Sequence, residues 1–432
     1  MDREAIGPVQ KVYTRRIEAA EQGSYIEVPF DMVPEAERLH VSISVGTAQG
    51  RTAVIDLGVR DAVRLRGWSG GARREFQIGR ERATPGYTPG PLEAGGWAVL
   101  LGAYRVPQEG CDVSVSITIE RERPRWLKGD LHMHSVHSDG SYTLEENAAI
   151  MAELGCDFLA MTDHNTTSQN AAYPRDAAVV MIPGMEFTTN FGHSNMLGVE
   201  VPIDDFRSVD QAGVNDKLRT ARERGAMIVL NHPHCDYCPW EWEFSDDFGI
   251  VEIWNGPWHE ANRRTLDWWD EQLRKGRRIV AVGGSDMHRP DPYRKHAHPT
   301  TWVYGRSRTV DGILEGIDAG HVVLSWAPDG PFVSLACGDR IVGDAVADDS
   351  GRPPVILTAE RLREGDAIRL ISDRGVERDI AVSAADGGSA VLEWHERGRQ
   401  YIRAEIWRKF EEVDRVLLAA VTNPIYFEPQ EG

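Results

Sequence analysis

The stretch Phe158-Leu159-Ala160-Met161-Thr162-Asp163-His164 is a short apolar run that ends in an acid and an imidazole. Consecutive apolar residues of this length predict a strand that is buried on both faces. The polar residues after it predict a loop at the carboxyl end of that strand. The same order, an apolar run followed by His, Asp or Glu, recurs between residues 130 and 288.

Helix-length segments separate several of these apolar runs. Thr143-Leu144-Glu145-Glu146 has the form of a capping box, and the helix that it opens is predicted to end at Gly155. Further helices are predicted to end at glycines in the segments Asp216 to Gly225, Ala261 to Gly276 and Thr309 to Gly320. Repeated strand-then-helix units predict a parallel sheet or barrel with both faces covered.

The segments on either side of this region alternate between apolar and polar residues. Leu39, Val41, Ile43 and Val45 follow this period of two, and so does the stretch from Val113 to Ile119. The alternation returns after Phe332. We therefore expect an accessory β-domain over residues 1–123, an α/β domain over 124–330 and a second small β-domain over 331–432.

The composition bounds the class of protein. The chain has 432 residues, of which 41% are hydrophobic and 27% charged, as in ordinary globular proteins. The formal net charge is −19, so we expect no nucleic-acid polymer and no membrane as partner. The start Met1-Asp2-Arg3-Glu4 lacks the apolar core of a signal peptide, which favours a cytoplasmic protein.

Imidazoles and acids gather at the predicted strand ends of the middle domain. Carboxyl ends of parallel strands share one face, so side chains far apart in sequence converge there. The predicted cluster consists of His132, His134, Asp139, His164, Glu186, His193, His232, Asp286 and His288. His137 is an alternative to Asp139, and His234 is an alternative to His232.

This set of donors predicts a metal centre. It exceeds the needs of one ion and suits two or three ions that share a carboxylate. Imidazole and carboxylate donors without a thiolate favour Zn²⁺, Mn²⁺ or Fe²⁺. Cys235 and Cys238 form the one CxxC pair among five cysteines, and we interpret them as incidental or site-lining. A zinc knuckle would need two further ligands nearby, and Pro239 argues against a thioredoxin-like motif.

Six ordered motifs resemble those of the polymerase-and-histidinol-phosphatase (PHP) superfamily. They are Asp130-Leu131-His132-Met133-His134, Ser138-Asp139-Gly140, Thr162-Asp163-His164, Gly184-Met185-Glu186, Asn231-His232-Pro233 and Ser285-Asp286-Met287-His288. The resemblance covers residues 127 to 328. The flanking β-domains, Glu252-Ile253-Trp254-Asn255-Gly256 and the closing Thr422-Asn423-Pro424-Ile425-Tyr426 resemble the CehA/McbA-type subgroup.

The resemblance implies a distorted (β/α)7 TIM-like barrel, flanked here by N- and C-terminal β-sandwich-like domains. It also implies a ligand set. A first ion would be held by His132, His134, Glu186 and Asp286, and Glu186 would bridge it to a second ion on His193 and His232. A third ion would be held by Asp139, His164 and His288.

Members of the superfamily hydrolyse phosphomonoesters or phosphodiesters, and the subgroup includes carbamate and related ester hydrolases. Bridging ions lower the pKa of a shared water from about 15.7 to near neutral, so a metal-bridged hydroxide is the expected nucleophile. We expect Glu186, Asp286 and Arg289 to act in catalysis. Arg289 follows His288 and is placed to reach a substrate anion. His234 or His259 is a candidate acid for the leaving group.

Three functions are compatible with these residues. We favour a metal-dependent phosphoesterase that acts on a small anionic phosphomonoester or phosphodiester. The alternative is a carbamate, ester or amide metallohydrolase, which would need an apolar pocket, and the aromatic segment Tyr237 to Trp242 gives it some weight. A non-catalytic binding protein is disfavoured, because a relic would have lost several ligands.

Overall fold

The strand predicted from Phe158 is present as β10 (Phe158–Ala160) in a computed structural model that describes residues 7–48, 50–244, 248–383 and 387–428. Met1 to Glu4, on which the signal-peptide argument rests, lie outside the described residues. No helix in the described ranges is long and apolar enough to cross a membrane. The chain forms two compact units, the first mainly from residues up to 123 and the second from residue 124 onward.

The first unit consists of two four-stranded antiparallel sheets around one apolar core. The alternating stretches that the sequence analysis identified lie side by side in one sheet, with Leu39 opposite Ile119 and Val41 opposite Ile117. This sheet is β1 (Val9–Ile17), β8 (Cys111–Arg121), β3 (Ala36–Gly46) and β6 (Glu75–Gly79). The other is β2 (Tyr25–Met32), β7 (Gly95–Arg105), β4 (Val54–Arg60) and β5 (Leu65–Trp68).

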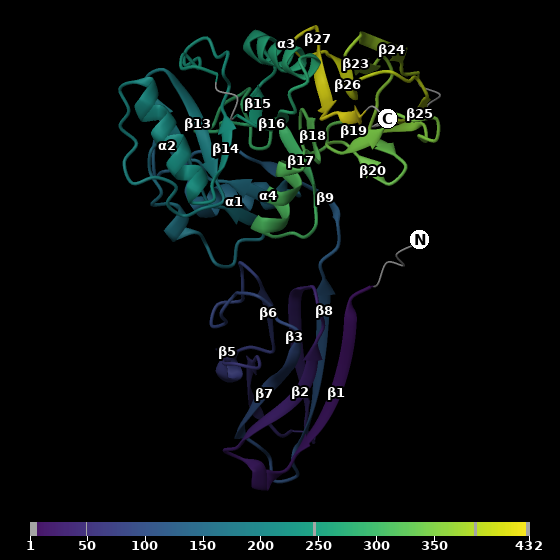
Figure 1. The fold of residues 1–432 in the computed structure, drawn as a ribbon. Coiled ribbons are helices and arrows are strands. Elements are labelled where there is room, and N and C mark those ends of the chain that lie inside the picture. The colour runs from purple at the N-terminus through teal and green to yellow at the C-terminus, as the bar shows by residue number, and fades with distance from the viewer. Residues whose placement is uncertain (1–6, 49, 245–247, 384–386, 429–432) are drawn as a thin grey trace. The chain divides into compact units, whose positions relative to one another are not determined.

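The second unit is mixed α/β, with many strands and few helices (Figure 1). Its first sheet includes β11 (Val180–Ile182), β10, β9 (Arg125–Asp130), β17 (Thr300–Gly305) and β18 (Val322–Ser325). Its second sheet is β12 (Gly184–Thr189), β13 (Gly192–Leu197), β14 (Met227–Leu230), β15 (Ile250–Asn255) and β16 (Val280–Gly284). The strand ladders of the described residues therefore do not form one closed barrel.

The helices begin and end largely where their capping residues predict. Thr143 Oγ1 accepts the backbone N–H of Glu146 at 3.2 Å, and the Glu146 carboxylate accepts the N–H of Thr143 at 2.8 Å. The second helix begins five residues before the predicted Asp216, because the Asp210 carboxylate caps it by accepting the N–H of Gly213. The helices are α1 (Leu144–Glu153), α2 (Gln211–Glu223), α3 (Glu260–Arg274) and α4 (Val310–Asp318).

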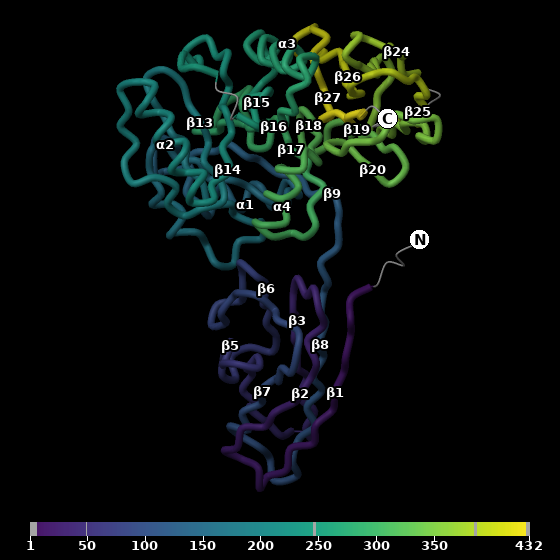
Figure 2. The backbone as a smooth tube through the Cα atoms, viewed as in Figure 1, coloured from purple at the N-terminus to yellow at the C-terminus, as the bar shows by residue number. Residues whose placement is uncertain are grey.

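The C-terminal strands continue the first sheet of this unit, because β18 pairs with β27 (Arg415–Thr422) (Figure 2). Beyond β27 the sheet includes β26 (Tyr401–Phe410), β23 (Ala367–Ser372), β24 (Gly375–Ala381), β28 (Ile425–Glu428) and β21 (Ala345–Ala347). A separate four-stranded sheet holds β20 (Arg340–Ile341), β19 (Phe332–Cys337), β22 (Val355–Glu360) and β25 (Ser389–Trp394). Strands on both sides of residue 330 thus share one sheet.

Asn423 joins this C-terminal region to β16, the strand that precedes Asp286. Its side-chain amide donates to the carbonyl oxygens of Ala281 and Val322 at 2.8 and 3.0 Å. Its Oδ1 accepts the N–H of Ala281 at 2.8 Å, and the residue is 2% exposed. The buried side-chain amide of Asn423 therefore provides hydrogen-bond partners for three backbone groups.

We expect Asn423→Ala to lower the free energy of unfolding by about 1 to 3 kcal/mol, because it leaves buried backbone groups unpaired. Chemical denaturation followed by tryptophan fluorescence measures this loss. Asn215→Ala, on the exposed surface of α2, is the matched control and is expected to change stability by less than about 0.5 kcal/mol. Equal effects of the two substitutions would contradict the role of Asn423.

Candidate metal centre

Most of the predicted ligands lie in loops after strands of the second unit, whereas Glu186 lies inside β12 and His193 inside β13. His132 and His134 follow β9, His164 follows β10, and Asp286 and His288 follow β16. Two isolated parallel bridges join the two sheets at this edge, one between Met133 and Met287 and one between His164 and Glu186. The bridges bring the loops that carry the ligands into contact.

The carboxylate of Glu186 lies at the middle of the cluster. Its strand, β12, is buried, and Glu186 is 1% exposed. Five imidazoles present a nitrogen between 2.8 and 3.6 Å from its oxygens, from His164, His193, His132, His232 and His134. The five rings come from four chain segments, because His132 and His134 both follow β9, and all five belong to the cluster that the sequence predicted.

A second carboxylate, that of Asp286, faces the same imidazoles. Its Oδ1 lies 3.0 Å from His134 Nε2 and 3.4 Å from His132 Nε2. With Glu186 on the other side, the two histidines stand between two acids. The structure therefore brings together all four residues that the resemblance assigns to a first ion.

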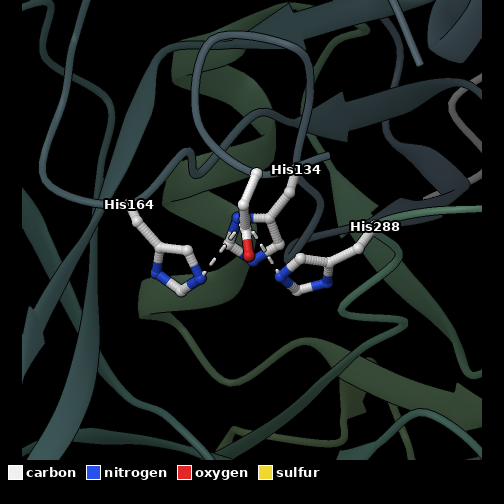
Figure 3. A group of neighbouring side chains, drawn as sticks. His134, His164 and His288 are labelled. Atoms are coloured by element: carbon white, nitrogen blue, oxygen red, sulfur yellow. Dashed lines mark ion pairs between the residues drawn. The ribbon is translucent and has the colours of Figure 1, made fainter. Parts of the chain in front are cut away.

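The remaining predicted acid belongs to a third group of neighbouring side chains. Asp139 Oδ1 lies 3.4 Å from His288 Nε2 and 3.7 Å from His164 Nε2. Figure 3 shows the rings of His134, His164 and His288 directed toward a common centre. Ligand atoms of Asp139 and these three histidines all lie within 4.8 Å of one another.

The backbone adopts unusual conformations where it presents these side chains. Asp286 has a φ of 52° and His232 a φ of 25°, a left-handed region that non-glycine residues rarely occupy. Hydrogen bonds hold both: Asp286 N–H donates to the His132 carbonyl oxygen at 2.8 Å, and His232 N–H donates to Glu252 Oε2 at 3.1 Å. A side chain at Gly284 would lie 2.3 Å from His132 Cβ, so only glycine fits there.

The charges of the cluster stabilise one another. Burial works against ionisation of Glu186, but His132 and His193 hold the pKa of its carboxyl well below the usual range. Burial likewise opposes protonation of His132, but Glu252, Asp286 and Glu186 raise its pKa well above the usual range. The carboxylates of Glu186 and Asp286 are thus paired with the imidazolium of His132, whereas burial lowers the pKa of His134.

Polar residues outside the predicted set hold the ligands in place. Glu252 Oε1 lies 2.9 Å from His132 Nδ1, which leaves Nε2 of that ring toward Glu186 and Asp286. Asn231 donates to Glu186 Oε1 at 2.8 Å. The apolar run around Glu252 and the motif around Asn231 are visible in the sequence, but nothing in their patterns assigned these contacts.

Two arginines lie near the cluster. Arg289, the predicted catalytic cation, is exposed, and its Nη2 lies 3.5 Å from the carbonyl oxygen of Asp139. Arg294, which the sequence analysis did not single out, lies closer: its Nη1 is 3.5 Å from Asp286 Oδ2 and donates to the carbonyl oxygen of Ser285 at 2.5 Å. A side chain at Gly256 would collide with this guanidinium.

The alternative histidines lie outside the cluster. His137 Nδ1 lies 2.8 Å from Ser168 Oγ, and His234 Nδ1 lies 3.2 Å from Thr265 Oγ1. His259 caps α3, where its Nδ1 accepts the N–H of Ala261.

A cavity of about 600 Å³ adjoins the cluster. Its lining includes His232, Asp286 and Arg294, and His259 also lines it. Among the described residues, Tyr237 is the only Tyr or Trp in that lining. Trp240 is 4% exposed and packs against Phe248 instead. The aromatic segment from Tyr237 to Trp242 thus contributes one ring to the cavity.

The donors fit a divalent metal. His132 Nε2 and Glu186 Oε2 are buried and make no hydrogen bond of normal geometry to any described residue, and the atoms within 2.8 to 3.6 Å of them belong to other predicted ligands. Buried polar atoms without a partner are costly, and ligand atoms that await a cation are a physical reason for them. Nitrogen and oxygen donors from imidazole and carboxylate are those of Zn²⁺, Mn²⁺ and Fe²⁺ sites.

No family model matches the chain. A 39-residue segment, 9% of the chain, is 46% identical to the DNA polymerase/3'-5' exonuclease PolX of Bacillus subtilis and spans 7% of that protein. A Bacteroides vulgatus two-domain protein containing a predicted PHP-like metal-dependent phosphoesterase is 18% identical, with a TM-score of 0.40, over 69% of this chain and 95% of that one. An amidohydrolase from Chromobacterium violaceum is 17% identical, with a TM-score of 0.30, over 39% of this chain and 89% of that one. At these levels of similarity, function has to be derived from the site itself.

We expect a divalent ion to displace protons when it binds. Since the pKa of His132 is raised well above its usual range in the metal-free protein, this ring carries a proton at neutral pH, whereas an imidazole that binds a metal must be neutral. Calorimetric titration with Zn²⁺ at pH 7 in buffers of different ionisation enthalpy should show release of at least about one proton per protein. The affinity of the protein for Zn²⁺ should continue to rise as the pH is raised above 6.5. Binding without proton release would contradict this charge state.

Glu252→Gln is expected to weaken metal affinity by about 10- to 100-fold, because the amide orients the His132 ring less strongly than the carboxylate does. Competition with a chromophoric chelator measures the affinity. Glu271→Gln, at an exposed position of α3, provides the matched control and should leave it unchanged. If both variants bind metal like the parent, Glu252 has no such role.

Proposed function

We propose that this chain is a metal-dependent hydrolase of small phosphomonoesters or phosphodiesters. The observation that carries the proposal is the carboxylate of Glu186 with five imidazole nitrogens within 3.6 Å. His132, His134, Glu186 and Asp286 would hold a first ion, and Glu186, His193 and His232 a second. Asp139, His164 and His288 would hold a third. When bound, such ions supply Lewis acidity and lower the pKa of water to about 7.

The protein's own groups have distinct tasks in this proposal. Glu186 and Asp286 stay ionised, since their pKa values are held well below the usual range, and so provide fixed negative charge for the cations. Arg294 holds a positive charge at the wall of the cavity, where it stabilises a substrate anion. His259 Nδ1 accepts a backbone N–H, so the neutral ring carries its proton on Nε2 and can donate a hydrogen bond to a leaving-group oxygen. Arg289 stays a predicted contact for the anion.

The surroundings of the cluster favour a phosphoester over a carbamate or carboxylic ester. A carbamate pocket would be expected to use the tryptophans of the 237–258 segment. Trp240 and Trp254 are instead buried, and Trp242 donates to Thr189 Oγ1 at 2.9 Å. A cation at the wall, Arg294, is what a phosphoryl group requires.

We also infer that the two sheets are the halves of the predicted seven-stranded barrel. The bridge between Met133 and Met287 links the end of β9 to the end of β16. The bridge between His164 and Glu186 links the end of β10 to β12. Followed through these bridges, β9, β10, β12, β13, β14, β15 and β16 form a ring, distorted because β13 runs antiparallel to both of its neighbours.

After loading with Mn²⁺ or Zn²⁺, the protein is expected to hydrolyse para-nitrophenyl phosphate or bis-para-nitrophenyl phosphate faster than 1-naphthyl methylcarbamate. Replacement of His132 and His134 by Ala should lower kcat/KM at least about 100-fold and remove bound metal, because both side chains are ligands. Product absorbance and elemental analysis measure the two effects.

His395→Ala is the control for this pair, since His395 is an exposed imidazole, 67% accessible, outside the cluster. It should retain full activity and metal content. Preferred turnover of the carbamate would contradict the proposed phosphoesterase function and support the alternative, a carbamate hydrolase. Full activity in the variant without His132 and His134 would refute the metal centre itself.

A further inference from the structure

Cys235 and Cys238 lie at the edge of the metal centre, in the loop after β14 that also carries His232. Both are free thiols, with their sulfur atoms 3.0 Å apart. Cys238 Sγ lies 3.8 Å from His232 Nδ1. Ligand atoms of His193, His232 and Cys238 all lie within 4.8 Å of one another.

We propose that Cys238 supplies a thiolate ligand to an ion that it shares with His193 and His232. This inference rests on the proposed metal centre and revises its second position. The ion would bind His232 through Nδ1, which faces Cys238, so Glu186, which faces Nε2, would belong to the first ion alone. A four-coordinate zinc site has metal–nitrogen distances of about 2.0 to 2.1 Å and metal–sulfur distances of about 2.3 Å, which puts neighbouring donors about 3.5 Å apart. The separation of Cys238 Sγ from the His232 ring nitrogen is within a few tenths of an ångström of that value.

The His232 ring lies between the thiol and Glu186. Its Nε2 is 3.5 Å from Glu186 Oε1, and its Nδ1 faces Cys238. His193 lies in the same group, so two imidazoles and one thiol surround a common point. This arrangement favours direct coordination.

A thiolate changes the metal preference of the position. Sulfur is a soft donor that favours Zn²⁺ or Co²⁺ over Mn²⁺, whereas the Glu186, His132, His134 and Asp286 position offers nitrogen and oxygen alone. The two positions would then select different ions. The sequence pattern did not reveal this, because a CxxC pair without two further cysteines or histidines in the usual spacing does not predict a zinc site.

The test is the absorption spectrum of the full-length protein loaded with Co²⁺. A thiolate bound to Co²⁺ gives an intense sulfur-to-metal charge-transfer band in the near ultraviolet. We expect this band in the parent protein and in Cys235→Ser, and we expect Cys238→Ser and Cys238→Ala to lack it. Both Cys238 variants should also bind Zn²⁺ at least about tenfold more weakly at one position. Circular dichroism confirms that each variant is folded.

The other outcomes overturn the inference in distinguishable ways. Co²⁺ binding to the parent without the band would show that sulfur is not a ligand, while the proposed centre stands. A band that survives in Cys238→Ser and disappears in Cys235→Ser would show that Cys235, and not Cys238, is the ligand. If the parent binds no Co²⁺ at all, the proposed metal centre fails and the thiolate ligand fails with it.

Discussion

The site depends on one buried carboxylate. Glu186 is 1% exposed, and its charge is surrounded by five imidazoles from four chain segments. A buried charge without partners would be very costly, so the position of Glu186 requires that the surrounding strands place donors against it. Asn231 restrains one of its oxygens through a hydrogen bond of 2.8 Å. The strand β12 can therefore hardly shift without breaking the cluster.

Constraints on the backbone extend outward from that carboxylate. Gly284 has no side chain because His132 and Glu252 occupy the space where one would lie. The strand that carries Gly284 is fixed at Ala281 by Asn423, which belongs to the C-terminal region. The β-rich region after residue 330 thus contributes to the site through hydrogen bonds from the Asn423 side chain to the backbone of β16, without supplying a predicted ligand.

Much of the candidate site could be predicted because buried strands have a simple pattern. An apolar run fixes where a strand ends, and the polar residue after it must then lie at the shared edge, as His164 does. Glu252 was not predicted to contact the ligands, because it lies inside its apolar run and not after it. The pattern places only residues at strand ends in the site. Arg294 lies in a loop without periodicity. The pairing of β18 with β27 joins residues about a hundred positions apart, and no local pattern encodes such a contact.

The charge distribution explains how an acidic protein can bind an anion. The formal net charge of −19 repels polyanions at the surface, but it is spread over the whole chain and screened over about 10 Å in ordinary salt. Within the cavity, the lining carries Arg294 together with the carboxylates of Asp236, Glu260, Asp286 and Asp291. Arg294 is anchored to the carbonyl oxygens of Ser285 and Asp286, so its positive charge cannot turn away from the wall. In the proposed function, a small anion would reach Arg294 and the cations that Glu186 and Asp286 would hold, whereas a long polyanion would also have to lie along the surface of an acidic protein.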